Sequence, residues 1–162
     1  MKSQFLLFTV CLFALAGFSQ SATKPNVPAM AKIDLAGRFA NGAAFKWYQE
    51  GDEFEAEGVE NGVSVAVAYS SAGIWTETER EMDKSKLPAS FSSGFQKSYP
   101  SGEIVGVESV ERPNKPLAYE VKFYVGKEFS ERIFNVQGVA EAGNGGDGSD
   151  GSGQEGSDDD ED

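Results

Sequence analysis

Residues 73–99 read GIWTETEREMDKSKLPASFSSGFQKSY and join a predicted strand to a predicted helix. In the second part of this stretch an apolar or aromatic side chain recurs at every fourth position: Leu87, Phe91, Phe95 and Tyr99. Positions with this spacing lie on one face of a helix. Pro88 suits the first turn, where its missing N–H would have no partner, and Pro100 and Gly102 end the pattern. The stretch therefore predicts an amphipathic helix whose aromatic face packs against a sheet.

The same pattern occurs once more, sixty positions earlier in the chain. Pro28 corresponds to Pro88, and Gly42 corresponds to Gly102. The four apolar positions of the earlier helix are Val27, Ala31, Leu35 and Phe39. After a five-residue insertion around residues 113–116, the strand positions Phe54, Ala56, Tyr69 and Gly73 match Tyr119, Val121, Phe134 and Gly138. These matches indicate an internal duplication, in which each repeat is one helix followed by three or four strands.

Seven stretches have the composition and the alternation of side chains that predict half-buried strands. They span residues 43–50, 53–60, 63–69, 74–82, 103–112, 119–125 and 128–136. Asn61-Gly62, between the second and the third of them, is a strong signal for a β-hairpin. The predicted fold class is α+β, with two tandem α-β-β-β(-β) repeats that form an antiparallel sheet and pack both helices on one of its faces.

The first 21 residues have the features of a signal peptide. Lys2 supplies the positive start, residues 5–18 form an apolar run, and cleavage fits best after Ser19 or Ser21. The run is shorter than the roughly 20 residues that a membrane-spanning helix needs. Lipid attachment at Cys11 is the alternative, but the residues just before Cys11 are not small. We therefore expect a periplasmic or secreted protein that is not inserted in the membrane after cleavage.

The composition excludes several classes of active site. The chain has no histidine and a single cysteine, Cys11, which would leave with the signal peptide. The mature protein would then lack the usual ligands of zinc and copper, an imidazole base and a thiolate nucleophile. The S-x-x-K motif at residues 21–24 lies in the cleavage zone and predicts no catalysis. We expect no cofactor, no metal and no disulfide, and a monomer that is held together by its apolar core.

Residues 143–162 consist of glycine, serine, other polar residues and acids, without any apolar side chain. Such a segment cannot bury surface and is predicted to be disordered. It holds eight of the 26 acidic residues of a chain with net charge −12, which disfavours binding to nucleic acid. A calcium loop that began at Asp147 would need an oxygen ligand at position 151 and a glutamate at position 158. The chain has Gly151 and Asp158 there, so the segment does not match a calcium loop. The predicted folded domain is therefore residues 26–141, with repeats at about 26–82 and 83–141.

Several motifs together carry a resemblance to a known family. They are Gly73-Ile-Trp-Thr-Glu-Thr-Glu, the helix start Leu87-Pro88, the helix end Lys97-Ser-Tyr-Pro, and Tyr119-Glu-Val-Lys-Phe followed by a final strand. In these features, residues 26–141 resemble the PepSY-like family, also called β-lactamase-inhibitor-like, of small exported proteins found chiefly in Bacteroidetes. The resemblance implies a tandem fold like that of β-lactamase inhibitory proteins, whose combined sheet can hold another protein.

We expect a non-enzymatic exported module that holds a protein or peptide partner on the open face of its sheet, with an inhibitory or regulatory role. The residues assigned to that face are Lys46, Tyr48, Glu55, Glu57, Trp75, Glu120, Lys122 and Tyr124. Tyrosine and tryptophan are enriched where partners anchor, although aromatic residues also suit an exposed strand.

The alternative function is a carboxylate-dependent hydrolase of the cell envelope. Glu77 and Glu79, which share one face of a predicted strand, are its nearest candidates. Alternating strand carboxylates usually form no more than a solvated face. A deep pocket that encloses paired carboxyls with raised pKa values would favour the enzyme, and an open sheet would favour binding.

Overall fold

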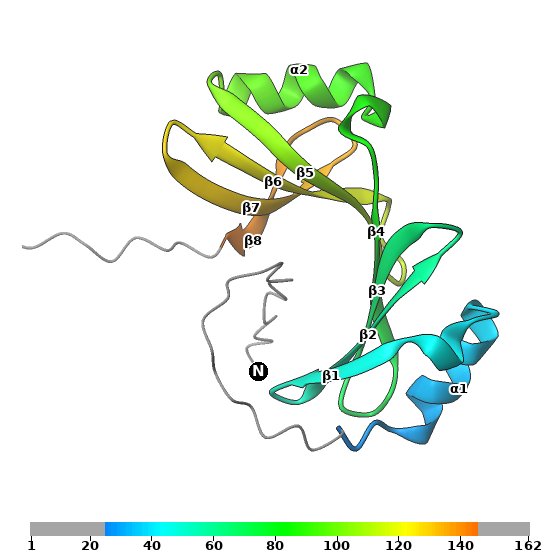
Figure 1. The fold of residues 1–162 in the computed structure, drawn as a ribbon. Coiled ribbons are helices and arrows are strands. Elements are labelled where there is room, and N and C mark those ends of the chain that lie inside the picture. Colours follow the sequence, from blue (N-terminus) through cyan, green and yellow to red (C-terminus); the bar gives the residue numbers. More distant parts are fainter. Residues whose placement is uncertain (1–24, 146–162) are drawn as a thin grey trace, which may run out of the picture.

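The computed structural model describes residues 25–145, which form two helices, two short 3₁₀ turns and one sheet of eight strands (Figure 1). In chain order the elements are α1 (Ala29–Arg38), η1 (Gly42–Ala44), β1 (Lys46–Glu50), β2 (Glu53–Glu60), β3 (Val63–Tyr69), β4 (Trp75–Glu81), η2 (Lys84–Lys86), α2 (Ala89–Ser98), β5 (Gly102–Glu111), β6 (Ala118–Val125), β7 (Glu128–Asn135) and β8 (Ala140–Gly145). Each strand pairs antiparallel with the next one in the sequence. The predicted α+β class is confirmed. Neither helix in this part of the chain is long and apolar enough to cross a membrane.

Both helices pack on the same face of the sheet, which we call the helix side (Figure 1). Under α1 the buried core consists of Val27, Ala31, Leu35, Phe39, Phe45, Phe54, Ala56, Val65, Val67 and Tyr69. Under α2 it is more aromatic and consists of Phe91, Phe95, Val107, Tyr119, Val121, Phe123 and Phe134. Successive residues of a strand point to opposite faces. The strand positions between these core residues therefore form the other face, which we call the open face because neither helix covers it.

Each half of the described chain consists of a helix followed by four strands. α1 and α2 begin directly after Pro28 and Pro88, so the repeated sequence pattern gives a repeated structure. The turn between β2 and β3 has positive φ angles at Asn61 and Gly62, 51° and 82°. A two-residue hairpin turn of this kind matches the right-handed twist of its two strands. Local turn chemistry therefore agrees with the strand pairing.

The structure contains one strand that the sequence pattern did not predict. β8 pairs with β7 through Phe134↔Ala140 and Arg132↔Gly145. The prediction of a disordered segment from residue 143 is therefore wrong for residues 143–145. An edge strand is held by backbone hydrogen bonds, which glycine and asparagine make as well as apolar residues do. The predicted signal peptide at residues 1–21 and the acidic stretch from residue 146 lie outside the described residues.

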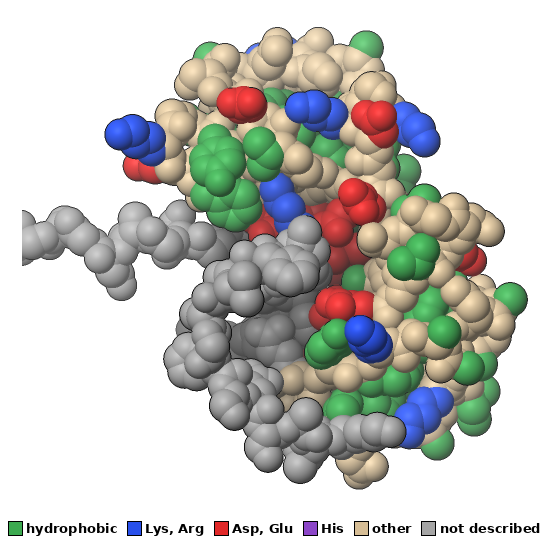
Figure 2. All heavy atoms as spheres, in the orientation of Figure 1, with side chains coloured by type: hydrophobic (Ala, Val, Ile, Leu, Met, Phe, Trp, Pro, Cys, Tyr) green, Lys and Arg blue, Asp and Glu red, His purple; other side chains and the backbone are tan. Residues whose placement is uncertain are grey.

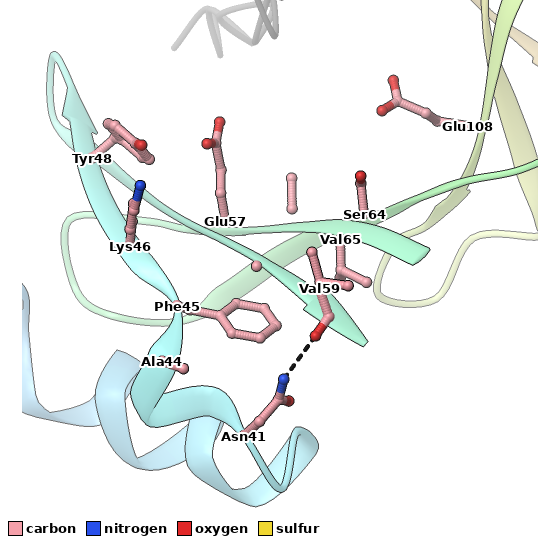
Figure 3. A pocket seen from close by; sticks show the side chains of 12 residues that line it. Asn41, Ala44, Phe45, Lys46, Tyr48, Glu57, Val59, Ser64, Val65 and Glu108 are labelled. Atoms are coloured by element: carbon pink, nitrogen blue, oxygen red, sulfur yellow. Dashed lines mark hydrogen bonds between the residues drawn. The ribbon is translucent and has the colours of Figure 1, made fainter. Parts of the chain in front are cut away.

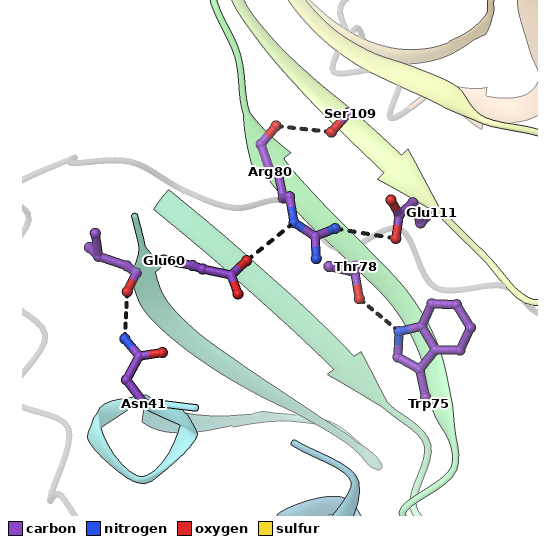
Figure 4. A network of polar contacts seen from close by, with 8 residues as sticks. Asn41, Glu60, Trp75, Thr78, Arg80, Ser109 and Glu111 are labelled. Atoms are coloured by element: carbon purple, nitrogen blue, oxygen red, sulfur yellow. Dashed lines mark hydrogen bonds and ion pairs between the residues drawn. The ribbon is translucent and has the colours of Figure 1, made fainter. Parts of the chain in front are cut away.

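The two halves meet where β4 pairs with β5, over four residues of each strand. β5 and β6, by comparison, pair over eight residues. On the helix side this junction is polar (Figure 4). Nε of Arg80 on β4 lies 3.8 Å from Oε2 of Glu60, and Nη1 lies 3.2 Å from Oε2 of Glu111 on β5. The Arg80 guanidinium also lies 5.7 Å from the ring centroid of Phe39. Ion pairs around one arginine therefore support the junction from this side.

In the second half, α2 lies very close to the turn between β7 and β8. A Cβ atom at Gly94 of α2 would lie 1.8 Å from the backbone oxygen of Gln137, so that position has room for no larger residue. Gly37 of α1 is different, because a Cβ atom there would have no neighbour within 4 Å. Gly94 therefore permits the close packing of helix on turn, whereas Gly37 has no such role.

We expect Gly94→Ala to lower the free energy of unfolding by about 1–3 kcal/mol, because the turn backbone must move away from the helix. Gly37→Ala makes the same change at an exposed helical position and should raise stability by about 0.5–1 kcal/mol. Urea denaturation of the two full-length variants measures both effects. If both substitutions shift the midpoint in the same direction, the described packing of α2 is wrong.

Candidate functional site

The open face carries seven of the eight residues that the sequence assigned to it: Lys46, Tyr48, Glu55, Glu57, Glu120, Lys122 and Tyr124. On β1 and β2, Lys46 pairs with Glu57 and Tyr48 with Glu55, so these four side chains lie on one face. On β6 the remaining three alternate with Val121 and Phe123, which are fully buried under α2. The predicted strand register is therefore confirmed for β1, β2 and β6.

The placement of Trp75 on the open face is wrong. The pairing of β3 with β4 contains a bulge, because Tyr69 pairs with Trp75 while the preceding Ala68 pairs with Glu77. The extra residue turns Trp75 toward the helix side. There the guanidinium of Arg38 lies 4.1 Å from the centroid of its ring, and its indole N–H donates to Oγ1 of Thr78 at 2.9 Å. Trp75 is therefore part of the α1 packing.

A hollow of about 520 Å³ lies on the open face of the first half (Figure 3). Small side chains of β3, Ser64 and Ala66, line it. Lys46, Tyr48 and Glu57 stand on the same side of the sheet, and Glu108 of β5 borders the hollow from the second half. Burial and the neighbouring Glu57 carboxylate raise the pKa of Tyr48, so its phenol stays neutral. Ala44, Phe45 and Val59 also line the hollow, which therefore combines small and apolar groups with polar and aromatic ones.

Two glutamates beside the hollow are buried where the two halves meet. Glu79 on β4 and Glu120 on β6, which we call the junction carboxyls, are each 5% exposed. They and Glu108 each place an oxygen within 4.8 Å of the others. Burial raises the pKa of Glu79 to about 8. Burial and hydrogen bonds with Glu131 and Glu79 raise the pKa of Glu120 further. The expectation of a solvated carboxylate face, made for Glu77 and Glu79, is therefore wrong for Glu79.

The raised pKa values indicate how the junction carboxyls interact. Glu120 is a neutral acid at pH 7 and can donate its proton in a hydrogen bond, while Glu79 and Glu131 can accept one. Next to them, Nζ of Lys122 lies 2.8 Å from Oε2 of Glu108 and 3.5 Å from Oε1 of Glu131. Although burial disfavours a charged amine, the carboxylates of Glu108 and Glu131 raise the pKa of Lys122. The cluster is thus held by the protons of the junction carboxyls and by one ammonium group.

Glu77, the second residue of the hydrolase alternative, takes part in an ion pair. Nε of Arg112 lies 3.8 Å from Oε2 of Glu77, and Nη2 lies 2.7 Å from Oε1 of Glu141 on β8. Burial raises the pKa of Glu77, and Arg112 opposes part of that rise. The recess beside Glu77 and Glu79 has a volume of about 10 Å³, which is room for about one water molecule. Paired carboxyls with raised pKa values are present, but this recess cannot admit a substrate.

Glu79, Glu108 and Glu120 form the acidic group in residues 25–145 whose oxygens lie close enough together to hold a metal ion. Carboxylate oxygens are the ligands that calcium and magnesium prefer. Here, however, the ammonium of Lys122 already pairs with Glu108, and Glu120 carries a proton that a metal ion would have to displace. The donor set therefore fits a proton-sharing cluster better than a metal centre.

Exposed aromatic side chains lie at both ends of the open face. Tyr48 is on β1 and is 45% exposed. Tyr124 on β6 and Phe129 on β7 are cross-strand partners, 40% and 53% exposed, with ring centroids 5.4 Å apart. Figure 2 shows acidic side chains gathered in the depression between the two lobes. The face thus has aromatic groups at its ends and carboxyl groups at its centre.

The residues of this site that sequence reasoning missed are Glu108, Arg112, Phe129 and Glu131. β5 could not be assigned a face from its pattern, because apolar residues occur on both faces and the pairing shifts between Ile104 and Gly106. On β7 the alternation that would place Phe129 and Glu131 becomes readable only once the pairing of Tyr124 with Phe129 is known. The duplication itself offered the available signal, since β7 corresponds to β3.

Solved structures from Bacteroides species share this fold. A BLIP-like (β-lactamase inhibitory protein-like) protein from Bacteroides fragilis NCTC 9343 is 24% identical, with a TM-score of 0.60 over 78% of this chain and 92% of that chain. A proposed periplasmic protein from Bacteroides eggerthii DSM 20697 is 18% identical, with a TM-score of 0.63 over 72% and 86%. A DUF2874 family protein from Bacteroides ovatus ATCC 8483 is 17% identical, with a TM-score of 0.62 over 72% and 85%. No protein-family model and no curated protein matches the chain. At these identities the likeness establishes the fold, and it confirms the BLIP-like architecture expected from the sequence.

The junction carboxyls predict an unusual dependence of stability on pH. Their pKa values in the folded state lie above the unfolded value, so the stability they contribute is complete below the unfolded pKa of about 4.3 and is lost as pH rises through the folded pKa values. We expect the free energy of unfolding to fall between pH 5 and pH 9, by about 1.4 kcal/mol per pH unit for each carboxyl that stays protonated only in the folded state. Glu120→Gln, which keeps a neutral donor at every pH, should reduce that fall, as measured by urea denaturation across the range.

Glu103→Gln is the matched control, because Glu103 is an exposed glutamate on the neighbouring strand β5. It should leave the pH dependence unchanged. If Glu120→Gln has the same pH profile as the native protein, Glu120 is ionised in the folded state and the shared-proton description is incorrect.

Proposed function

We propose that this protein is a non-enzymatic exported module that binds a protein or peptide partner on the open face of its sheet and acts as a monomer. The observation that supports this most strongly is the one-sided packing of both helices, which leaves an eight-stranded face uncovered by either helix. That face contains the hollow of about 520 Å³ and exposed aromatic side chains at both ends. An open, hollowed sheet with aromatic anchors has the form of a protein-binding surface.

The exposed tyrosines are the proposed anchors. Tyr48 and Tyr124 each project a ring from the open face, and neither is needed for the buried cores under the helices. Tyrosine supplies a large contact area with few rotatable bonds and a hydroxyl that can bond to the partner. Lys46, Glu55, Glu57, Glu120 and Lys122 would supply polar contacts between them. Trp75 is not included, because it packs under α1.

The hydrolase alternative has one observation in its favour, the raised pKa of Glu79. A general acid must reach its substrate, and Glu79 is 5% exposed beside a recess of about 10 Å³. We therefore favour binding over catalysis. Inhibition or regulation of the partner would follow from occupying its surface.

Two observations support a location outside the cytoplasm. The first 21 residues have the charge and hydropathy pattern of a signal peptide. The fold is shared with a proposed periplasmic protein from Bacteroides eggerthii. We place the protein in the periplasm or outside the cell.

Site-specific photo-crosslinking in intact cells tests the binding face. A photoreactive benzoylphenylalanine at Ser64, which lines the hollow, should form a discrete crosslinked species. The same group at Gln96, an exposed position of α2, should not. Equal crosslinking from both positions, or from Gln96 alone, would place the partner elsewhere.

Alanine substitutions then test how much the two tyrosines contribute to capture of the crosslinked partner. Tyr48→Ala and Tyr124→Ala should each weaken capture by about 1–3 kcal/mol while leaving the melting temperature nearly unchanged, because both rings are exposed. Ile33→Ala is the matched control, since Ile33 is 72% exposed on the outer surface of α1. Capture that is equally sensitive to Ile33→Ala would contradict the proposal.

A further inference from the structure

We propose that the partner segment held by the open face is cationic: an extended peptide stretch whose lysine or arginine side chain enters the hollow and whose apolar groups contact the aromatic ends. This inference rests on the proposed function and specifies the chemistry of its ligand. The charge of the face, the distance between its aromatic ends and the position of the hollow all support this ligand.

The centre of the open face has more acidic than basic groups. Its basic residues in the described chain include Lys46, Arg112 and Lys122, and the charge of Lys115 also acts on Glu77 of this face. Its central acidic residues are Glu55, Glu57, Glu77, Glu79, Glu108, Glu120 and Glu131. Lys122 and Arg112 are already engaged with glutamates of the same face. Even with the junction carboxyls protonated, carboxylates outnumber ammonium and guanidinium groups. An incoming cation is therefore attracted, and an anionic segment is repelled.

The hollow gives that cation a defined position. Glu57 and Glu108 border it from the two halves of the protein, and the small side chains of Ser64 and Ala66 line it. Lys46 lines it as well, so two carboxylates face one ammonium group there. The ring of Tyr48 also borders it, and an aromatic face attracts a lysine or arginine head group. Because Glu108 also places an oxygen within 4.8 Å of oxygens of both junction carboxyls, a cation in the hollow acts on them directly.

The aromatic ends show that the ligand is longer than a single amino acid or a small amine. Tyr48 is on β1 and Tyr124 on β6, five strand spacings apart in the sheet order. Neighbouring strands are about 4.8 Å apart, so the two rings are separated by roughly 24 Å along the sheet. A ligand that contacts both ends and fills the hollow must be an extended chain with both charged and apolar groups.

Binding of a cation should also release protons. The charged and titratable groups that face the junction carboxyls are Glu55 on β2, Glu77 on β4, Glu108 on β5, Lys122 on β6 and Glu131 on β7, with Arg112 beside Glu77. A positive charge placed near them favours the ionised form of Glu79. By linkage, the cationic ligand should bind more tightly at pH 8.5 than at pH 6.

Fluorescence anisotropy with three labelled ten-residue peptides tests the inference on the full chain. The peptides share two aromatic residues and differ at the other positions, which are rich in lysine, serine or glutamate. We expect the lysine peptide to bind at least ten times more tightly than the serine peptide, and the glutamate peptide to bind most weakly. The affinity of the lysine peptide should fall with added salt and rise from pH 6 to pH 8.5.

Paired variants separate the hollow from general charge attraction, including attraction to the eight acidic residues beyond residue 146. Glu57→Gln should weaken binding of the lysine peptide several-fold, and Asp52→Asn, an equal change of charge at an exposed turn, should not. Equal effects of the two variants, equal binding of the lysine and serine peptides, or no binding of the lysine peptide would each overturn the inference. Discrete crosslinking at Ser64 in cells would still stand in those cases, so the two proposals can fail separately.

Discussion

The pairing of β4 with β5 over four residues is the constraint on which the rest of the structure depends. The buried residues under α1 and α2 form separate clusters, and Met82, directly after β4, packs against the core under α2. The junction is supported by polar groups on both sides of the sheet: Arg80 with Glu60 and Glu111 on the helix side, and the junction carboxyls Glu79 and Glu120 on the open face. Two halves that would each bury little surface alone are thereby combined into one continuous sheet.

The same junction determines the character of the open face. Because the carboxyls that support it are buried at its centre, the middle of the face is acidic, and the aromatic groups lie toward its ends. Protonation lets Glu79 and Glu120 lie close together, and it lowers the stability at alkaline pH. A site that is held together in this way responds to any positive charge that approaches it, which connects the stability of the junction to ligand binding.

Much of the architecture could be predicted from the sequence, because the duplication repeats the same helix face and strand alternation twice. The correspondence of Pro28 with Pro88 and of Tyr69 with Phe134 can be read from the sequence. The alternation of side chains along a strand predicts that Lys46, Tyr48 and Tyr124 lie on the open face. Three features could not be predicted from the sequence pattern. Trp75 changes face at a bulge, β8 has too few apolar side chains to give a strand pattern, and the burial of Glu79 depends on β5 and β6, which come later in the sequence.

Titration of the glutamate side-chain carboxyl carbons by ¹³C NMR can show directly whether the junction carboxyls are protonated, since the chemical shift of each carbon reports the protonation of its group. We expect Glu120 to stay protonated through pH 8 and Glu79 to titrate near pH 8, both well above the ordinary glutamate pKa of about 4.3. Assignment through Glu120→Gln and Glu79→Gln identifies the two signals. If every glutamate has ionised by pH 6, the junction is not held by a shared proton and the open face has no acidic buried centre.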